Sequence, residues 1–170
     1  MLFAGRLIEH KNVDLLLEAF DRVAADNDAT LGIVGDGPER DALEAQADAL
    51  IHADRVEFLG FLDDYEDVLG YMRAADIFCS PSTREGFGLT FAEAMAADCT
   101  VIAVNHPDSA ADEVIDDAGF LVEPTVDASV DSKRVSPRGC RHDAARKQEP
   151  TVPAVCVDRE QTTASPVGGE

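Results

Sequence analysis

Two glutamates, Glu85 and Glu93, flank a glycine-containing segment whose residue types suit the binding of an anion beside a polyol. Gly86 and Gly88 directly precede a predicted helix, and the free N–H groups at a helix N-terminus favour an anion such as a phosphate. The backbone amides near Gly88 and Leu89 are therefore candidate phosphate contacts. Glu85 would lie in the loop and Glu93 about one turn into the helix. Both carboxylates can then face one crevice and accept hydrogen bonds from sugar hydroxyls.

The same carboxylates have two other interpretations. Thr90 and Glu93 match the spacing of a capping box, and a capping glutamate needs no ligand. From the pattern alone, this structural role of Glu93 is favoured over a binding role. A carboxylate pair could also serve a glycosidase as acid and nucleophile. We disfavour a hydrolase, because a phosphate-type loop on a parallel sheet indicates a donor that carries a nucleotide.

Positive charge near the same region comes from Arg6 and Lys11. The chain has 14 Lys and Arg residues against 34 Asp and Glu residues, so each cation stands out. A diphosphate would need such partners to offset its charge. The alternative is that Arg6 pairs with a carboxylate and that Lys11 is solvated at a helix start. The pattern alone favours that alternative.

Strand-like and helix-like segments alternate through residues 1–127. The predicted strands are Leu2–Phe3, Thr30–Val34, Val56–Leu59, Ile77–Cys79, Thr100–Val104 and Phe120–Val122. The predicted helices lie near residues 13–25, 39–51, 65–74, 90–97 and 111–116, the first of them capped by Asn12. This alternation, with short apolar strands, predicts an α/β fold: one domain with a Rossmann-like, doubly wound parallel sheet.

In such a sheet the ligand crevice lies outside the carboxyl ends of the strands. The loops that follow the predicted strands contain Gly5-Arg6, Gly35–Pro38, Gly60-Phe61, Ser80–Gly88 and Asn105–Pro107. Small and polar residues therefore recur at one edge. Among the histidines, only His106 is predicted to lie there.

The formal charge of −20 excludes several function classes. Such a field repels nucleic acids and anionic membranes, so we expect no nucleic-acid partner. The sequence has no run of about 20 apolar residues and no signal-peptide pattern, which predicts a cytoplasmic protein. The excess of Asp and the scarcity of Lys resemble proteins of halophilic organisms.

Residues 128–170 differ from the rest of the chain. Residues 1–127 hold 28 acidic and 7 basic residues, whereas residues 128–170 hold 6 acidic and 7 basic ones and lack apolar periodicity. This composition predicts a disordered tail outside the domain. Cys79 and Cys99 lie in apolar runs and are expected to be reduced and buried, while Cys140 and Cys156 lie in the tail. No cysteine spacing indicates a disulfide or a metal site.

These residues, in this order, resemble the C-terminal, nucleotide-sugar-binding domain of family 4 glycosyltransferases of the GT-B fold. The resemblance covers about three quarters of the chain and is carried by the following segments: Phe3–Leu7 with Lys11, Leu15–Phe20, Ile33–Glu39, Arg55–Gly60, Ala74–Ile77, Pro81-Ser82, Glu85–Leu89, Glu93–Ala96 and Gly119–Val122. The two glutamates separated by seven residues around Gly-Phe-Gly are its most specific feature.

The resemblance implies transfer of a sugar from a nucleotide-diphosphate donor to an acceptor, with retention of configuration and without a metal or other cofactor. By this resemblance, Arg6 and Lys11 bind the diphosphate, Glu85 contacts the donor sugar at the catalytic centre, and Glu93 contacts the ribose. The backbone of Phe87, Gly88 and Leu89 contacts the sugar or phosphate, and Arg55 and Val56 border the base. The resemblance moves Glu93 from a cap to a ligand contact, although both roles can coexist.

The sequence also departs from the family. Against the family pattern we expect the N-terminal, acceptor-binding domain to be missing, and therefore a truncated enzyme with little or no activity in this chain alone. The family's glycine-containing loop is replaced by Asp108–Glu113, of which only Glu113 carries over.

The alternative function is that of a non-catalytic remnant that binds a nucleotide or nothing. An oxidoreductase is disfavoured, because no Gly-x-Gly-x-x-Gly follows the first strand. The sequence does not identify the donor nucleotide or its sugar, nor whether the acceptor is a glycan, a lipid or a small molecule. By the resemblance, the full-length enzyme can be peripheral to the membrane.

Overall fold

Within the described residues, the strands form a six-stranded parallel sheet with the order β3-β2-β1-β4-β5-β6. The computed structural model describes residues 1–123. The strands are β1 (Leu2–Ala4), β2 (Leu31–Val34), β3 (Val56–Gly60), β4 (Ile77–Ser80), β5 (Thr100–Val104) and β6 (Gly119–Val122). The helices are α1 (Val13–Ala24), α2 (Arg40–Asp48), α3 (Tyr65–Ala74), α4 (Leu89–Ala96) and α5 (Ala111–Ile115), with short 3-10 turns η1 (Glu9–Lys11), η2 (Ala53–Arg55) and η3 (Asp116–Ala118). The predicted Rossmann-like α/β fold is confirmed.

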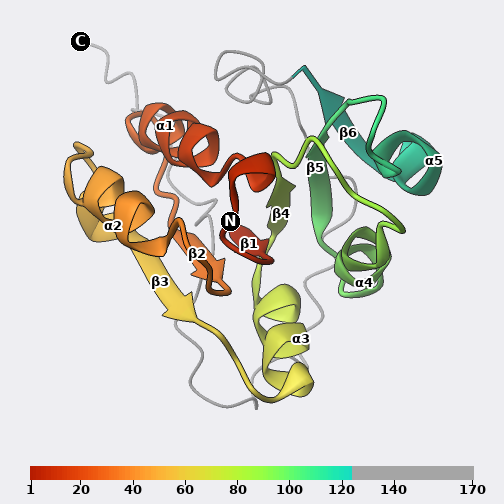
Figure 1. The fold of residues 1–170 in the computed structure, drawn as a ribbon, viewed down its shortest axis with the longest axis horizontal. Coiled ribbons are helices and arrows are strands. Elements are labelled where there is room, and N and C mark those ends of the chain that lie inside the picture. The colour runs from red at the N-terminus through yellow and green to blue at the C-terminus, as the bar shows by residue number, and fades with distance from the viewer. Residues whose placement is uncertain (124–170) are drawn as a thin grey trace, which may run out of the picture.

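Helices cover both faces of the sheet, which explains why β2 is buried along its whole length (Figure 1). On one face, α1 and α2 pack their apolar side chains on β1 and β2, with Leu17 and Phe20 of α1 fully buried. On the other face, α3, α4 and α5 enclose a second core that contains Phe78 and Phe91. Burial of each such side chain contributes about 1.5–3 kcal/mol to folding.

The strand order reverses between β1 and β4, which are neighbours in the sheet although about 70 residues separate them. From β1 the chain moves outward to β2 and β3, then returns to β4 on the other side. The loops that leave β1 and β4 therefore run side by side at the carboxyl edge, where the crevice of such a sheet lies.

The first two loops at this edge pack so closely that only glycine fits. Gly35 has a φ of 132°, and a Cβ placed on it would lie 1.8 Å from the carbonyl oxygen of Gly5. A Cβ on Gly37 would lie 2.2 Å from the Leu7 carbonyl oxygen. The Leu7 amide also donates to the Asp36 carbonyl at 3.0 Å. These contacts fix the start of the segment that carries Arg6 and Lys11.

Two local capping predictions were wrong. Asn12 adopts the left-handed conformation (φ 47°, ψ 41°) and its side chain does not cap α1. Thr90 and Glu93 do not form a capping box, because α4 already begins at Leu89 after Gly88, whose φ is 61°, and has no side-chain cap. In both places the chain turns through a left-handed residue rather than through an extended capping residue.

The buried cysteines agree with expectation. Cys79 is 5% exposed and Cys99 is 7% exposed, and neither forms a disulfide within the described residues. Burial raises the pKa of the Cys79 thiol to about 11, so this side chain behaves as a small apolar group. The predicted domain end at residue 127, the tail 128–170, Cys140 and Cys156 lie outside the described residues. Within residues 1–123, no helix is both long and apolar enough to cross a bilayer.

Candidate functional site

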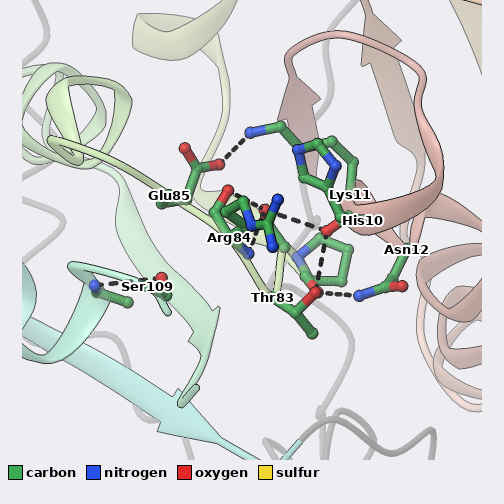
Figure 2. Close-up of polar contacts among 10 residues, drawn as sticks. His10, Lys11, Asn12, Thr83, Arg84, Glu85 and Ser109 are labelled. Carbon is green, nitrogen blue, oxygen red and sulfur yellow. Dashed lines mark hydrogen bonds and ion pairs between the residues drawn. The ribbon is translucent and has the colours of Figure 1, made fainter. Parts of the chain in front are cut away.

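The loop after β1 is hydrogen-bonded to the loop after β4 at the switch in strand order (Figure 2). The carbonyl oxygen of His10 accepts from the Thr83 amide at 3.0 Å and from the Ser82 hydroxyl at 3.3 Å. The side-chain amide of Asn12 donates to the Pro81 carbonyl at 3.0 Å. The two loops thus form one wall of the predicted crevice.

Lys11 and Glu85 meet in this wall. The Lys11 ammonium donates to a carboxylate oxygen of Glu85 in an ion pair, and the two side chains are only 15% and 17% exposed. The structure therefore brings together a residue predicted to bind phosphate and the residue predicted to lie at the catalytic centre. Lys11 is not the solvated charge of the alternative interpretation.

Arg6 comes before Lys11 in the same loop and has a different environment. It follows the last residues of β1 and is exposed. Among residues 1–123, the ion pairs within 4.0 Å do not include Arg6. The alternative in which Arg6 merely pairs with a carboxylate is therefore not realised in the described part of the chain. Its guanidinium is available to an anion.

The segment between the two glutamates follows β4 at the carboxyl edge of the sheet. Gly88 takes a left-handed conformation, and a Cβ on it would lie 2.9 Å from Val114 of α5, so α4 begins in close contact with α5. Because no side chain caps α4, the amides of Leu89 and Thr90 at its start can donate to an anion, whereas the Phe91 amide donates to the Gly88 carbonyl at 3.0 Å. The side chains of Phe87 and Leu89 are 86% and 68% exposed and are not part of the core.

A second loop contact fixes the backbone of Glu85. Its carbonyl accepts from the amide of Ala110 at 2.9 Å, and Glu85 forms a bridge with Ser109 in the loop after β5. His106 lies in the same loop, where its Nδ1 accepts from the Asp108 amide at 3.2 Å, a local turn contact. Glu113 is exposed on α5. The backbone of Glu85 is thus held by the loop after β5, while its side chain meets Lys11.

Glu93 is half-buried on α4 and faces the start of α3. A hydrogen bond to Glu93 raises the pKa of the Tyr65 hydroxyl, with burial and the negative charges of Glu93 and Glu66 adding to the effect. Tyr65 is the first residue of α3, after Asp64, whose carboxylate caps the helix by accepting from the Glu66 amide at 2.9 Å. Sequence analysis missed Tyr65, although its place just after the β3 loop could have suggested it.

Arg55 and Val56 are not brought together with the other candidates. They lie at the beginning of β3, which is the amino edge of the sheet, opposite the crevice. There the Arg55 guanidinium donates to the Asn27 carbonyl at 3.0 Å and lies 3.6 Å from the Asp28 carboxylate. This placement argues against the predicted contact of these two residues with a base.

A small apolar cavity of about 30 Å³ lies elsewhere, between α1 and the sheet. It is lined mainly by aliphatic side chains, among them Leu16, Val23, Ile102 and Val122. None of the candidate residues lines it. Within residues 1–123, no group of three or more His, Cys, Asp or Glu side chains is placed to hold a metal ion. The candidate residues at the carboxyl edge offer cations, backbone amides and carboxylates.

Comparison with known proteins gives consistent relatives. The alpha-monoglucosyldiacylglycerol synthase of Streptococcus pneumoniae is 39% identical over 108 residues, which are 63% of this chain and 24% of that protein. The phosphatidyl-myo-inositol mannosyltransferase of Mycobacterium tuberculosis is 42% identical over 106 residues, 61% of this chain and 27% of that protein. The chain thus spans about a quarter of the length of the curated relatives it matches.

Solved structures agree with these relatives. The C-terminal domain of a group 1 family glycosyl transferase from Francisella tularensis has a TM-score of 0.66 at 30% identity, covering 77% of this chain and 71% of that one. Anabaena HepE in complex with UDP-glucose has a TM-score of 0.67 at 29% identity, covering 76% and 36%. The model of the family described as glycosyl transferases group 1 matches residues 1–134. With this sheet order and this edge site, the chain belongs to the glycosyl transferases group 1 family.

Proposed function

We propose that residues 1–123 bind the nucleotide-diphosphate sugar donor of a retaining glycosyltransferase. The observation that carries this proposal is the Lys11–Glu85 ion pair at the point where the strand order reverses, with Arg6 exposed in the same loop as Lys11. Two cations and a carboxylate at this place suit a diphosphate next to a sugar. The solved complex of HepE with UDP-glucose supports a donor of this class.

The diphosphate has three groups of partners in this proposal. Arg6 offers an exposed guanidinium, Lys11 an ammonium, and the start of α4 the amides of Leu89 and Thr90. As the bond to the sugar breaks, negative charge grows on the leaving diphosphate. Cations and amides already aimed at that position stabilise the charge without reorganising, which lowers the barrier. No protein nucleophile is required for this contribution.

The two glutamates hold the rest of the donor. Glu85 accepts hydrogen bonds from hydroxyls of the donor sugar, close to the reacting carbon, and Glu93 accepts from the ribose. Tyr65 holds the Glu93 carboxylate from α3. The base then lies over the loop after β3, where Phe61 is 71% exposed, rather than near Arg55 and Val56.

We propose that the acceptor binds outside residues 1–123, because the matched segment is about a quarter of each relative's length. The isolated chain is then expected to bind a donor with little or no transfer. The names of two relatives contain diacylglycerol and phosphatidyl-myo-inositol. On this basis we propose a lipid acceptor and a cytoplasmic enzyme that works at the membrane surface. The acidic described domain would not itself be drawn to anionic lipid.

Calorimetric titration with UDP- and GDP-sugars in molar salt tests the proposal. Arg6→Ala and Glu93→Ala should each weaken binding about tenfold or more, because each removes a charged hydrogen-bonding partner. Arg55→Ala is the matched control: it removes a guanidinium at the opposite edge and should leave binding unchanged. Absence of binding by a folded wild-type chain would reject the donor site and favour a non-catalytic remnant.

A further inference from the structure

Lys11 is attached to the loop after β4 through both of its neighbours in sequence. On one side, the His10 carbonyl accepts from the Thr83 amide at 3.0 Å and from the Ser82 hydroxyl. On the other side, the Asn12 side-chain amide donates to the Pro81 carbonyl at 3.0 Å. Figure 2 shows both attachments beside the Lys11–Glu85 pair. The contacts of His10 and Asn12, rather than those of Lys11 itself, thus set the position of the Lys11 backbone relative to Glu85.

Asn12 combines two properties at this position. Its backbone is left-handed, a conformation that asparagine tolerates better than most residues other than glycine. Its side chain does not cap α1, although it stands at the cap position, and reaches instead across the crevice wall to Pro81. The amide therefore ties the loop after β1 to the loop after β4, which a helix-capping role would not do.

The Lys11 side chain has little room beyond this attachment. A Cβ placed on Gly5 would lie 4.0 Å from Lys11 Cε, so the stem runs beside the end of β1. The side chain is 15% exposed and ends on Glu85. A lysine carries high rotamer entropy, and holding it in one place costs less when its backbone is already fixed.

We propose that Asn12 is a positioning residue: its amide bond to Pro81 sets Lys11 against Glu85 and against the donor diphosphate. The part that concerns the diphosphate rests on the proposed function. The part that concerns Glu85 does not, because the ion pair is present without a donor. Asn12 acts through Lys11, so its contribution should vanish when Lys11 is removed.

The binding experiment titrates UDP and GDP into the wild type, Asn12→Gly, Lys11→Met and the double variant. Glycine keeps the left-handed turn and removes only the amide. Lys11→Met should weaken binding of the preferred nucleotide about tenfold to a hundredfold, and Asn12→Gly about three- to tenfold. In the Lys11→Met background, Asn12→Gly should have no further effect. Equal losses in both backgrounds would show a purely structural role and overturn the proposal.

Asn27→Gly is the matched control. Asn27 also donates a side-chain amide bond to a carbonyl, that of Val23 at 2.8 Å, but it lies beyond the other end of α1. It should leave nucleotide binding unchanged while affecting stability to a comparable extent. If Asn27→Gly weakened binding as much as Asn12→Gly does, the positioning role would be rejected.

A second experiment needs no nucleotide and separates this inference from the proposed function. Thermal unfolding of Lys11→Met, Glu85→Gln and the double variant measures the coupling of the ion pair. In the Asn12→Gly background this coupling should fall to less than half. An unchanged coupling would overturn the positioning role, even if nucleotides bind. A reduced coupling would support the positioning role even if neither nucleotide binds. The lack of nucleotide binding would reject only the donor site.

Discussion

The Lys11 ammonium and the Glu85 carboxylate form an ion pair although 74 residues separate them in sequence. Both side chains are more than four-fifths covered, so the pair is shielded from solvent and from salt. A diphosphate that binds Lys11 has to share or displace Glu85. In the proposed function, the pair therefore links the two halves of donor recognition, phosphate and sugar.

Glu85→Gln should separate these two halves. Loss of the Glu85 charge frees Lys11 and removes the repulsion between that carboxylate and the diphosphate. Plain UDP or GDP should therefore bind about fivefold more tightly, as expected for the removal of one unit charge about 4 Å from the diphosphate. The advantage of the nucleotide sugar over the plain nucleotide should fall, because a sugar contact is lost. Calorimetry with both ligands measures the two effects. Glu18→Gln, an exposed carboxylate on α1, should change neither; weaker binding of the plain nucleotide by Glu85→Gln would contradict the linkage.

Gly35→Ala should destabilise the fold by about 3 kcal/mol or more, because the new Cβ meets the Gly5 carbonyl oxygen and the φ of 132° strains any other residue. Chemical denaturation gives the free energy of unfolding. Gly70→Ala serves as the control: it lies in α3 with nothing within 4 Å of the new Cβ, and should stabilise by about 0.5–1 kcal/mol. Equal effects of the two substitutions would contradict the close packing of the loops.

Tyr65 should report on Glu93. The raised pKa of Tyr65 means that its protonated hydroxyl is favoured in the folded chain, so the interaction stabilises below the ordinary pKa of 10.0 and is lost as the pH rises through the raised value. Absorbance titration in a Tyr71→Phe background observes Tyr65 alone, since the chain has two tyrosines. Glu93→Gln should lower the Tyr65 pKa, whereas Glu57→Gln on β3 should not. An unchanged pKa in Glu93→Gln would remove Tyr65 from the site.

Asp21 should contribute to stability in a pH-dependent way. Burial raises its pKa, but hydrogen bonds from the backbone and ring of His52, both at 2.8–2.9 Å, outweigh burial and hold the pKa below 3.8. The stabilisation is therefore present above pH 3.8 and is lost as the pH falls through the lower, folded-state value. Asp21→Asn should destabilise by about 1–2 kcal/mol at neutral pH and by less in acid. The exposed Asp48→Asn should show no such trend; a constant deficit for Asp21→Asn would contradict the assignment.

Local pattern was sufficient for the elements and for part of the site. The alternation of apolar strands with amphipathic helices depends on near neighbours, and it predicted the parallel sheet and its crevice edge. The same rule could have placed Arg55, because a residue that precedes a parallel strand lies at the edge opposite the crevice. The contact of Arg55 and Val56 with a base, which the family resemblance implies, stays a prediction that their place at the opposite edge disfavours.

The sequence by itself determined the α/β architecture and the segments that carry Arg6, Lys11, Glu85 and Glu93. Only the tertiary structure decided how their side chains are used. Asn12 and Glu93 have the spacing of caps, yet each has a partner from a distant segment, Pro81 and Tyr65 respectively. Lys11 reaches Glu85 because two loops meet where the strand order reverses. Capping propensity is worth only about 1 kcal/mol, so contacts made by packing override it, and sequence spacing cannot reveal them.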